Sequence, residues 1–381
     1  MEPNESAIRD QPGGHPAKAR PDSVEPAVVR RRAALSIDQF VNGILHGDRA
    51  ILAQAITLIE SSRTADRALA EKIVEGCLPH SGNSIRIGIT GVPGAGKSSL
   101  IESLGTWLIG ERREKIAVLA IDPSSQISGG SILGDKTRMA SLASSDLAFI
   151  RPSPARGSFG GVAQHTREAM LLCEAAGYRN IFVETIGVGQ SETAVHEMVD
   201  FFLLILLAGA GDELQGIKRG VMELADVVVI NKADGANLHA AEKARAEAEN
   251  ALHYLPRSLS GWAPRALTCS ALTGNGIREL WQCVEVHSEQ TKGNGWFSRT
   301  RTQQAQKWMQ DLIRQGLQLR FESQPEIQRR LLALNQDVLE GRITSFRAAR
   351  ELLEAYSGTR AETRKSSSQI ESIPGPSQSQ V

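Results

Sequence analysis

Residues 91–98, Gly-Val-Pro-Gly-Ala-Gly-Lys-Ser, match the pattern G-x-x-x-x-G-K-[ST] of a phosphate-binding loop. An apolar run precedes this loop and a helix-compatible stretch follows it. In that context glycines let successive backbone N–H groups face phosphate oxygens, and the helix N-terminus adds its positive end. We expect Lys97 to reach the β- and γ-phosphates and the Ser98 hydroxyl to bind Mg²⁺. The pattern predicts a nucleoside triphosphate site formed by Gly91, Val92, Pro93, Gly94, Ala95, Gly96, Lys97, Ser98 and Ser99.

A second motif, Asn231-Lys232-Ala233-Asp234, ends a β-branched run that begins at Ala225. The Asp234 carboxylate can accept two hydrogen bonds from guanine, whereas adenine lacks that donor pair and would leave a buried carboxylate unpaired. We expect Asn231 to brace the neighbouring loops and the Lys232 stem to lie over the purine. On its own the motif is also compatible with a surface turn. Its position after the phosphate loop favours GTP, with further contacts from a later run that ends in Ser270, Ala271 and Leu272.

Carboxylates end two other apolar runs, and the carboxyl ends of parallel strands share one edge of a sheet. Glu184, in the pattern Glu-x-x-Gly, is predicted to bind Mg²⁺ directly or through water, while the Gly187 N–H faces the γ-phosphate. Asp122 ends another run, and Asp135 lies in the Gly/Ser-rich segment that follows it. Both are candidate Mg²⁺ ligands, although each is also compatible with a helix or turn cap.

The residues for water activation depart from the usual GTPase pattern. No Gln follows Gly187 directly, and the nearest is Gln190, so we expect slow intrinsic hydrolysis that a partner or second subunit accelerates. A further loop, 209–219, contains Lys218 and is placed to sense the nucleotide or a client protein. A solvated charged turn is the alternative interpretation of that loop.

These motifs together resemble the MeaB/ArgK-type GTPases, and they occur in the family's order: 91–98, 122–125, 129–139, 184–192, 211–218 and 231–234. The resemblance implies a GTP-hydrolysing, Mg²⁺-dependent chaperone that gates adenosylcobalamin loading and protects methylmalonyl-CoA mutase or a related acyl-CoA mutase. It also implies switch loops around 122–138, 184–192 and 209–219 and a homodimer. The resulting candidate catalytic set is Lys97, Glu184, Gly187, Gln190 and Lys218. An ArgK-like transport-associated NTPase or kinase is the alternative function.

Composition agrees with a globular enzyme of this kind. The 381 residues hold 43 basic and 43 acidic side chains, so nothing favours nucleic acid or an anionic membrane as partner. The four cysteines are far apart in sequence and are predicted to be reduced core thiols rather than a zinc site. The N-terminus lacks the apolar segment of a signal peptide, and we expect a cytoplasmic protein.

The chain divides into five predicted regions. We expect a P-loop α/β domain with a mostly parallel sheet flanked by helices, helical additions at both ends of it, and disordered tails. Thr64 is predicted to cap the third N-terminal helix. The C-terminal helices carry more apolar side chains than a lone extension can hide, which suits dimerisation, with packing on the core as the alternative. The regions are 1–35 (tail), 36–82 (N-terminal helices), 83–292 (GTPase domain), 293–357 (C-terminal helical dimerisation region) and 358–381 (tail).

Overall fold

The computed structural model describes residues 35–122, 139–154, 159–185, 191–209, 219–256 and 258–370. The chain separates into two units, Met1–Ser36 and Ile37–Val381. All elements discussed below belong to the second unit.

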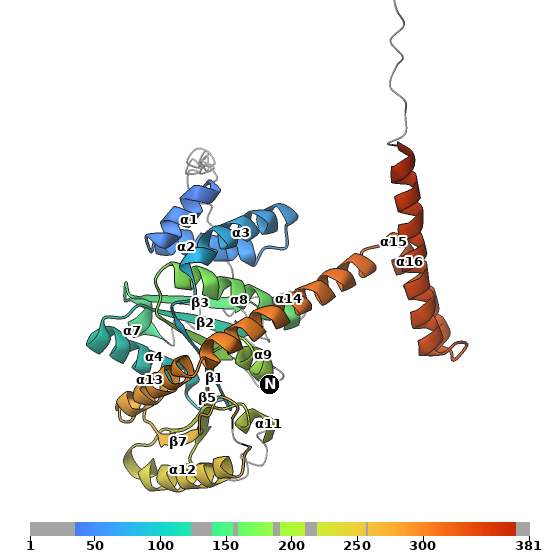
Figure 1. The fold of residues 1–381 in the computed structure, drawn as a ribbon. Coiled ribbons are helices and arrows are strands. Elements are labelled where there is room, and N and C mark those ends of the chain that lie inside the picture. Colours follow the sequence, from blue (N-terminus) through green and yellow to red (C-terminus); the bar gives the residue numbers. More distant parts are fainter. Residues whose placement is uncertain are drawn as a thin grey trace, which may run out of the picture. The chain divides into compact units, whose positions relative to one another are not determined.

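A parallel sheet organises the described part of the chain (Figure 1). Its seven strands lie in the order β3-β2-β4-β1-β5-β6-β7. Most of these strands are continuous apolar runs, as expected for a sheet covered on both faces. The predicted α/β fold is therefore confirmed. The strands are β1 (Ile85–Gly91), β2 (Ile116–Asp122), β3 (Ala148–Pro154), β4 (Asn180–Thr185), β5 (Phe201–Leu207), β6 (Val227–Asn231) and β7 (Arg265–Thr268).

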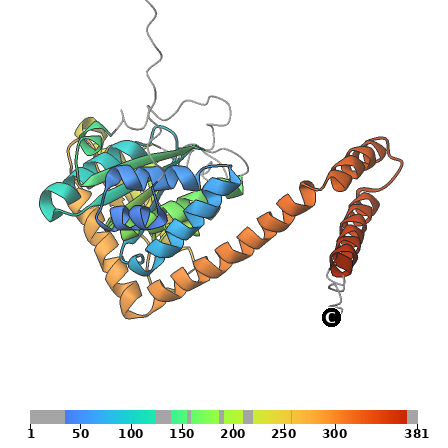
Figure 2. The same cartoon turned by 90° about the horizontal axis from the view of Figure 1, so that it is seen from above.

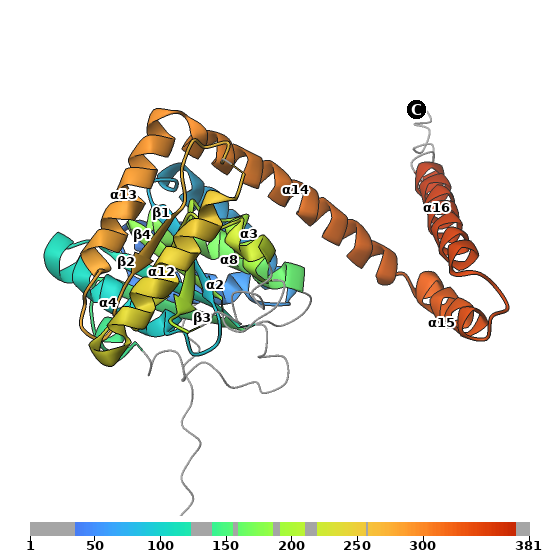
Figure 3. The same cartoon turned by 90° about the horizontal axis from the view of Figure 1, so that it is seen from below.

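Helices cover both faces of the sheet because alternate strand residues point to opposite sides. Ile87 and Ile89 of β1 belong to one buried cluster with residues of α4 (Lys97–Trp107) and α13 (Ile277–Gly293). Leu204 of β5 belongs to a second cluster, with α12 (Leu238–His253), on the opposite face. Figure 3 shows α13 and α12 as separate layers. The remaining core helices are α7 (Ala140–Ala143), α8 (Phe159–Ala175), α9 (Ser191–His196) and α11 (Arg219–Met222), with short turns at Leu78–His80, Leu108–Arg112 and Gly235–Asn237.

Three N-terminal helices, α1 (Ile37–Leu45), α2 (Arg49–Ile59) and α3 (Thr64–Cys77), pack on one another and on α8 (Figure 2). Asp48 caps α2, since its Oδ1 accepts hydrogen bonds from the N–H groups of Ala50 and Ile51 at 2.8 and 3.1 Å.

The prediction that Thr64 caps α3 is wrong by one position. Thr64 is already helical, and the N-cap residue is Arg63, which makes no side-chain capping bond. Ser61 organises this turn instead. Its hydroxyl donates to Asp66 at 2.7 Å and accepts from the Arg63 N–H at 3.2 Å.

The C-terminal region consists of α14 (Trp296–Glu322), α15 (Pro325–Leu339) and α16 (Ser345–Ile370). Arg301 of α14 donates to both carboxylate oxygens of Asp200 at 2.7 and 2.8 Å and so joins this helix to the start of β5. Helix α14 begins close to the start of the predicted region 293–357, whereas α16 continues beyond its end to Ile370. Within the described ranges, no helix is both long and apolar enough to span a bilayer.

Candidate functional site

The phosphate loop connects β1 to α4, as its sequence predicted. Gly91, Gly94 and Gly96 have φ values of 154°, 79° and 88°, which other residues rarely adopt. Close neighbours also demand glycine at the first and last of these positions. A Cβ on Gly91 would lie 2.3 Å from the Ile205 carbonyl oxygen, and one on Gly96 would lie 2.6 Å from the Asn231 amide nitrogen. The loop therefore passes so close to β5 and to the end of β6 that only glycine fits at these two positions.

Lys97 is the buried cation of this loop. Its ammonium donates to the carbonyl oxygens of Gly91 at 2.7 Å and Val92 at 3.3 Å. Burial lowers the pKa of Lys97, and the carboxylates of Glu184 and Glu192 oppose that shift. The loop thus holds a lysine at the first position of α4, and helix N-termini of this kind are suited to binding phosphate oxygens.

Glu184 lies beside the phosphate loop because β4 pairs with β1, with Ile89 opposite Glu184. The Ser98 hydroxyl donates to Glu184 Oε1 at 2.8 Å, and Glu184 is buried. A hydroxyl and a carboxylate held this close are the oxygen donors that Mg²⁺ prefers, so the donor set fits the ion. Asp122 ends β2 one residue after Ile121, which pairs with Thr185, so its backbone reaches the same edge of the sheet.

Asn231, at the end of β6, joins the phosphate loop to the segment after β7. Its amide nitrogen donates to the Ala95 carbonyl at 2.8 Å, and its amide oxygen accepts from the Ala271 N–H at 3.3 Å. Asn231 is buried, so these bonds are shielded from water. This is the bracing role that the sequence predicted for it.

The rest of the motif forms a turn that presents Asp234. Lys232 has φ of 59°, a left-handed conformation that is strained for a lysine. The Ser270 hydroxyl donates to Asp234 Oδ2, and the Asn237 amide donates to the Lys232 carbonyl at 2.7 Å. The turn is thereby fixed against the segment that carries Ser270.

One cavity of about 560 Å³ connects the two motifs. Residues from both line it, including Gly96, Ser99, Asp234 and Leu272. Sequence reasoning missed other members of this wall. Three of them, Glu102, Ser103 and Thr106, lie on the same face of α4 as Ser99, at helical spacing from it. The fourth, Ser141, lies near the start of α7.

Several predicted site residues cannot be placed. Asp135, Gly187, Gln190 and Lys218 lie outside the described residues, and of Asp122 only the backbone is described. In the part of the chain that the structure describes, no group of three or more His, Cys, Asp or Glu side chains is arranged to hold a metal ion. The cysteines Cys77, Cys173, Cys269 and Cys283 are buried and unbonded to one another, and burial raises the pKa of the Cys77 thiol to about 11.

A parallel sheet with a phosphate loop after β1 and an Asn-Lys-x-Asp turn after β6 defines a P-loop NTPase. Comparison with known proteins gives the family: residues 52–326 match the model of the methylmalonyl-CoA mutase-associated GTPase MeaB. The chain therefore belongs to the MeaB family of GTPases.

Relatives agree with this assignment. GTPase ArgK of Escherichia coli is 49% identical over 274 residues, which cover 72% of this chain and 82% of the relative. The mouse protein called methylmalonic aciduria type A homolog, mitochondrial, is 43% identical over 330 residues, covering 84% of this chain and 79% of the relative. The crystal structure of a protein called LAO/AO transport system kinase is 37% identical with a TM-score of 0.69 and covers 85% of this chain and 100% of that one.

Proposed function

We propose that this protein is a Mg²⁺-dependent GTPase chaperone that gates adenosylcobalamin loading and protection of methylmalonyl-CoA mutase or a related acyl-CoA mutase. The observation that carries the nucleotide part is the bond network of Asn231, which holds the phosphate loop and the Asp234 turn around one cavity. The client is proposed from the family description and from the name of the mouse relative.

The roles of the site residues follow from their positions. Lys97 neutralises developing charge on the β- and γ-phosphates, while Ser98 and Glu184 would hold Mg²⁺, and Asp122 would supply a further ligand from the neighbouring strand. The metal ion supplies Lewis-acid stabilisation of the transferred phosphoryl group. Asp234 accepts hydrogen bonds from guanine, and the backbone N–H groups of the Ser270 segment face guanine O6.

Base choice is tested by Asp234→Asn. In the wild type the Asp234 carboxylate accepts hydrogen bonds from N1–H and the amino group of guanine. The asparagine amide can instead donate to the carbonyl that xanthine has in place of that amino group. The variant should lose GDP affinity and gain affinity for xanthosine diphosphate, measured by competition titration. Comparable affinity of the wild-type protein for ATP and GTP would contradict the guanine assignment.

The chaperone role is tested by GTP turnover with and without a purified adenosylcobalamin-dependent acyl-CoA mutase. The wild type should be stimulated by the mutase, and by linkage the GTP-bound form should bind the mutase with changed affinity. Lys97→Ala should lack both basal and stimulated turnover, since losing one such contact costs about 3–4 kcal/mol of transition-state stabilisation. No stimulation by any acyl-CoA mutase of the host would favour the transport-associated alternative, which the name of the solved relative suggests.

We also propose a homodimer that forms through α14–α16. Exposed apolar side chains recur at helical spacing on these helices, which is more apolar surface than a monomer normally leaves in water. They are Met309, Ile313, Leu317, Leu319, Leu332, Leu339, Phe346 and Leu353.

A further inference from the structure

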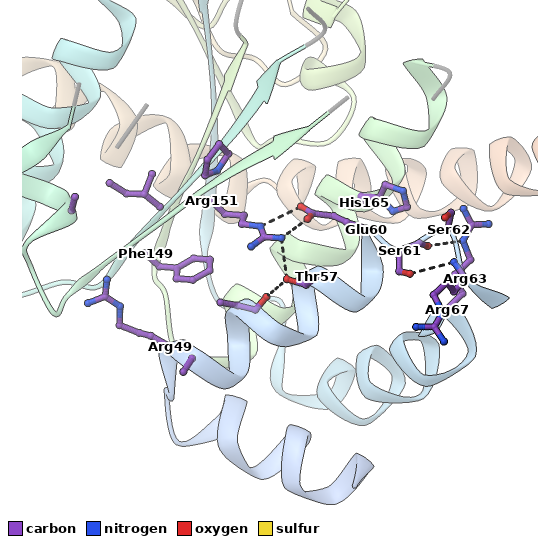
Figure 4. A pocket seen from close by; sticks show the side chains of 15 residues that line it. Arg49, Thr57, Glu60, Ser61, Ser62, Arg63, Arg67, Phe149, Arg151 and His165 are labelled. Carbon is purple, nitrogen blue, oxygen red and sulfur yellow. Dashed lines mark hydrogen bonds and ion pairs between the residues drawn. The ribbon is translucent and has the colours of Figure 1, made fainter. Parts of the chain in front are cut away.

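A second cavity, of about 780 Å³, lies between α2 and strand β3 (Figure 4). Strand β3 is one of the two edge strands of the described sheet, so its outer side has no neighbouring strand there. The lining follows α2 from its first residue, Arg49, to Arg63 in the turn after its end, and it shares no residue with the lining of the nucleotide cavity. We call this cavity the α2–β3 groove.

The floor of the groove is largely apolar. Phe149 and Ile150 of β3 and Ala53 of α2 contribute to it, together with Pro152. A volume of this size and a largely apolar floor with polar groups around it are typical of sites for small organic molecules. An added peptide strand fits less well, because Pro152 has no N–H to donate to such a strand.

Arginines dominate the charge along the groove, with four of them against one lining carboxylate, that of Glu60. Arg151 uses its guanidinium within the protein, donating to Glu60 Oε1 at 3.3 Å and to the Thr57 hydroxyl at 3.2 Å. The charges of Arg151 and Glu60 therefore neutralise each other. Among the described residues, no second lining carboxylate balances the remaining cations, which are Arg49, Arg63 and Arg67.

Arg49 stands at one end of the groove and has only weak partners. It donates to the Ser145 carbonyl at 3.1 Å and lies 3.5 Å from the carboxylate of Asp146, whose side chain is fully exposed. Surface ion pairs of this kind are typically worth about 0–1 kcal/mol. A ligand anion can therefore compete for this guanidinium.

Arg63 and Arg67 lie at the other end of the groove, and their interactions within the protein are as weak as those of Arg49. Arg63 lies 3.9 Å from Asp66 while itself 79% exposed. Arg67 donates through Nε to the Ser61 carbonyl at 3.2 Å, a neutral acceptor that leaves its charge unbalanced. Both guanidinium groups are thus also open to a ligand anion.

The end of the groove at Arg63 and Arg67 has further groups for an anion. The N-terminus of α3 lies there, and its N-cap residue Arg63 makes no side-chain capping bond, so the positive end of the helix dipole adds to the charge of the arginines. His165 of α8 lines the same cavity. Its Nδ1 is buried without a hydrogen-bond partner among the residues described, the Glu168 carboxylate lying 3.9 Å away.

We propose that the α2–β3 groove binds an elongated organic anion, with one acidic group held by Arg63 and Arg67 and a second held by Arg49. The two ends are separated by the length of α2, which at 1.5 Å per residue is roughly 16 Å. The neutral middle of the ligand lies on the apolar floor. This site is separate from the nucleotide site and does not depend on the proposed function.

Titration calorimetry on the full chain tests the proposal, with excess GDP and Mg²⁺ present to occupy the nucleotide site. The probes are succinyl-CoA, which has phosphates at one end and a carboxylate at the other, and coenzyme A, which has phosphates at one end only. Succinyl-CoA should bind one molecule per chain and more tightly than coenzyme A. Either Arg49→Ala or the double variant Arg63→Ala/Arg67→Ala should weaken succinyl-CoA binding by about tenfold or more, because each removes charge-assisted bonds.

Arg320→Ala is the matched control, since it removes one exposed arginine from α14 and should leave affinity unchanged. Coenzyme A binding should respond to substitution at one end of the groove only. Thermal melts check that each variant is folded, and GTP turnover in the same samples separates this proposal from the proposed function. No binding of either probe, equal loss in the control, or tighter binding of hexaglutamate than of both coenzymes would overturn the proposal.

Discussion

Asn231 is the side chain that links the phosphate loop to the segment after β7, so its loss should loosen the contact between these two parts of the nucleotide site. Asn231→Ala removes the bond to the Ala95 carbonyl at 2.8 Å and the bond from the Ala271 N–H at 3.3 Å. A neutral hydrogen bond contributes about 1 kcal/mol net, so the two together give about 2 kcal/mol of lost unfolding free energy. Ala95 is buried, and its carbonyl would lose this partner. Because a buried polar group without a hydrogen bond costs additional free energy, the loss of stability should be at least this large.

Nucleotide affinity should fall along with stability. The amide sets the spacing between the loop that meets the phosphates and the segment that meets the base, so a free nucleotide would have to restore that spacing on binding. We expect a loss of GDP affinity of about tenfold, which corresponds to about 1.4 kcal/mol. The two readouts are urea unfolding without nucleotide and GDP titration by calorimetry.

Asn237→Ala is the matched control, because Asn237 makes one exposed bond, to the Lys232 carbonyl at 2.7 Å. Exposed groups exchange such bonds with water, so the control should lose less than about 0.5 kcal/mol. An Asn231 variant that unfolds at the wild-type urea concentration and binds GDP with wild-type affinity would refute the reasoning. Equal losses in both variants would show that the amide bridge has no special role.

Three further predictions use other parts of the molecule. Gly96→Ala should abolish tight GTP binding in a nucleotide titration. The new Cβ would lie 2.6 Å from the Asn231 amide nitrogen, and the φ of 88° at this position is strained for alanine. Burial raises the pKa of Asp226 to about 7, so this group lowers the free energy of unfolding as pH rises from about 4 to 7, and burial lowers the pKa of His287 to about 4, so that group raises it between about 4 and 6.5. In the wild type the two effects nearly cancel. Asp226→Asn should therefore make the free energy of unfolding rise with pH between about 4 and 6.5. Leu332→Asp should convert the proposed dimer to a monomer in light scattering, whereas Leu238→Asp, at an exposed leucine on α12, should not.

The sequence predicted those parts of the site in which local pattern and chemistry coincide. The phosphate loop needs glycines at fixed spacing, and the base motif needs a carboxylate at the end of an apolar strand, so both were visible without a structure. The position of Glu184 beside the phosphate loop also followed, because the carboxyl ends of parallel strands share one edge of the sheet. These features depend on short stretches and on the general rules of α/β sheets.

Other features depend on contacts between distant residues and could not be read in advance. Strand β3 went unrecognised because Pro152 and Pro154 interrupt its pattern, and only an edge position tolerates them. The α2–β3 groove likewise lies between two segments that are far apart in sequence, as the contact of Arg151 with Glu60 across 91 residues shows. Neither segment carries a motif of its own.

The two ends of the sheet have different roles, and one short helix connects them. The nucleotide motifs follow the carboxyl ends of β1, β4 and β6, whereas α14 is attached at the amino ends through Arg301 and Asp200. Helix α9 lies in sequence between Glu184 and Asp200. The segment that follows α9 is bonded to α14, since the Gln304 amide donates to the Val199 carbonyl at 2.8 Å and Lys307 pairs with Glu197. The segment that connects α9 to β5 is therefore attached to α14 at the end of the sheet opposite the nucleotide motifs.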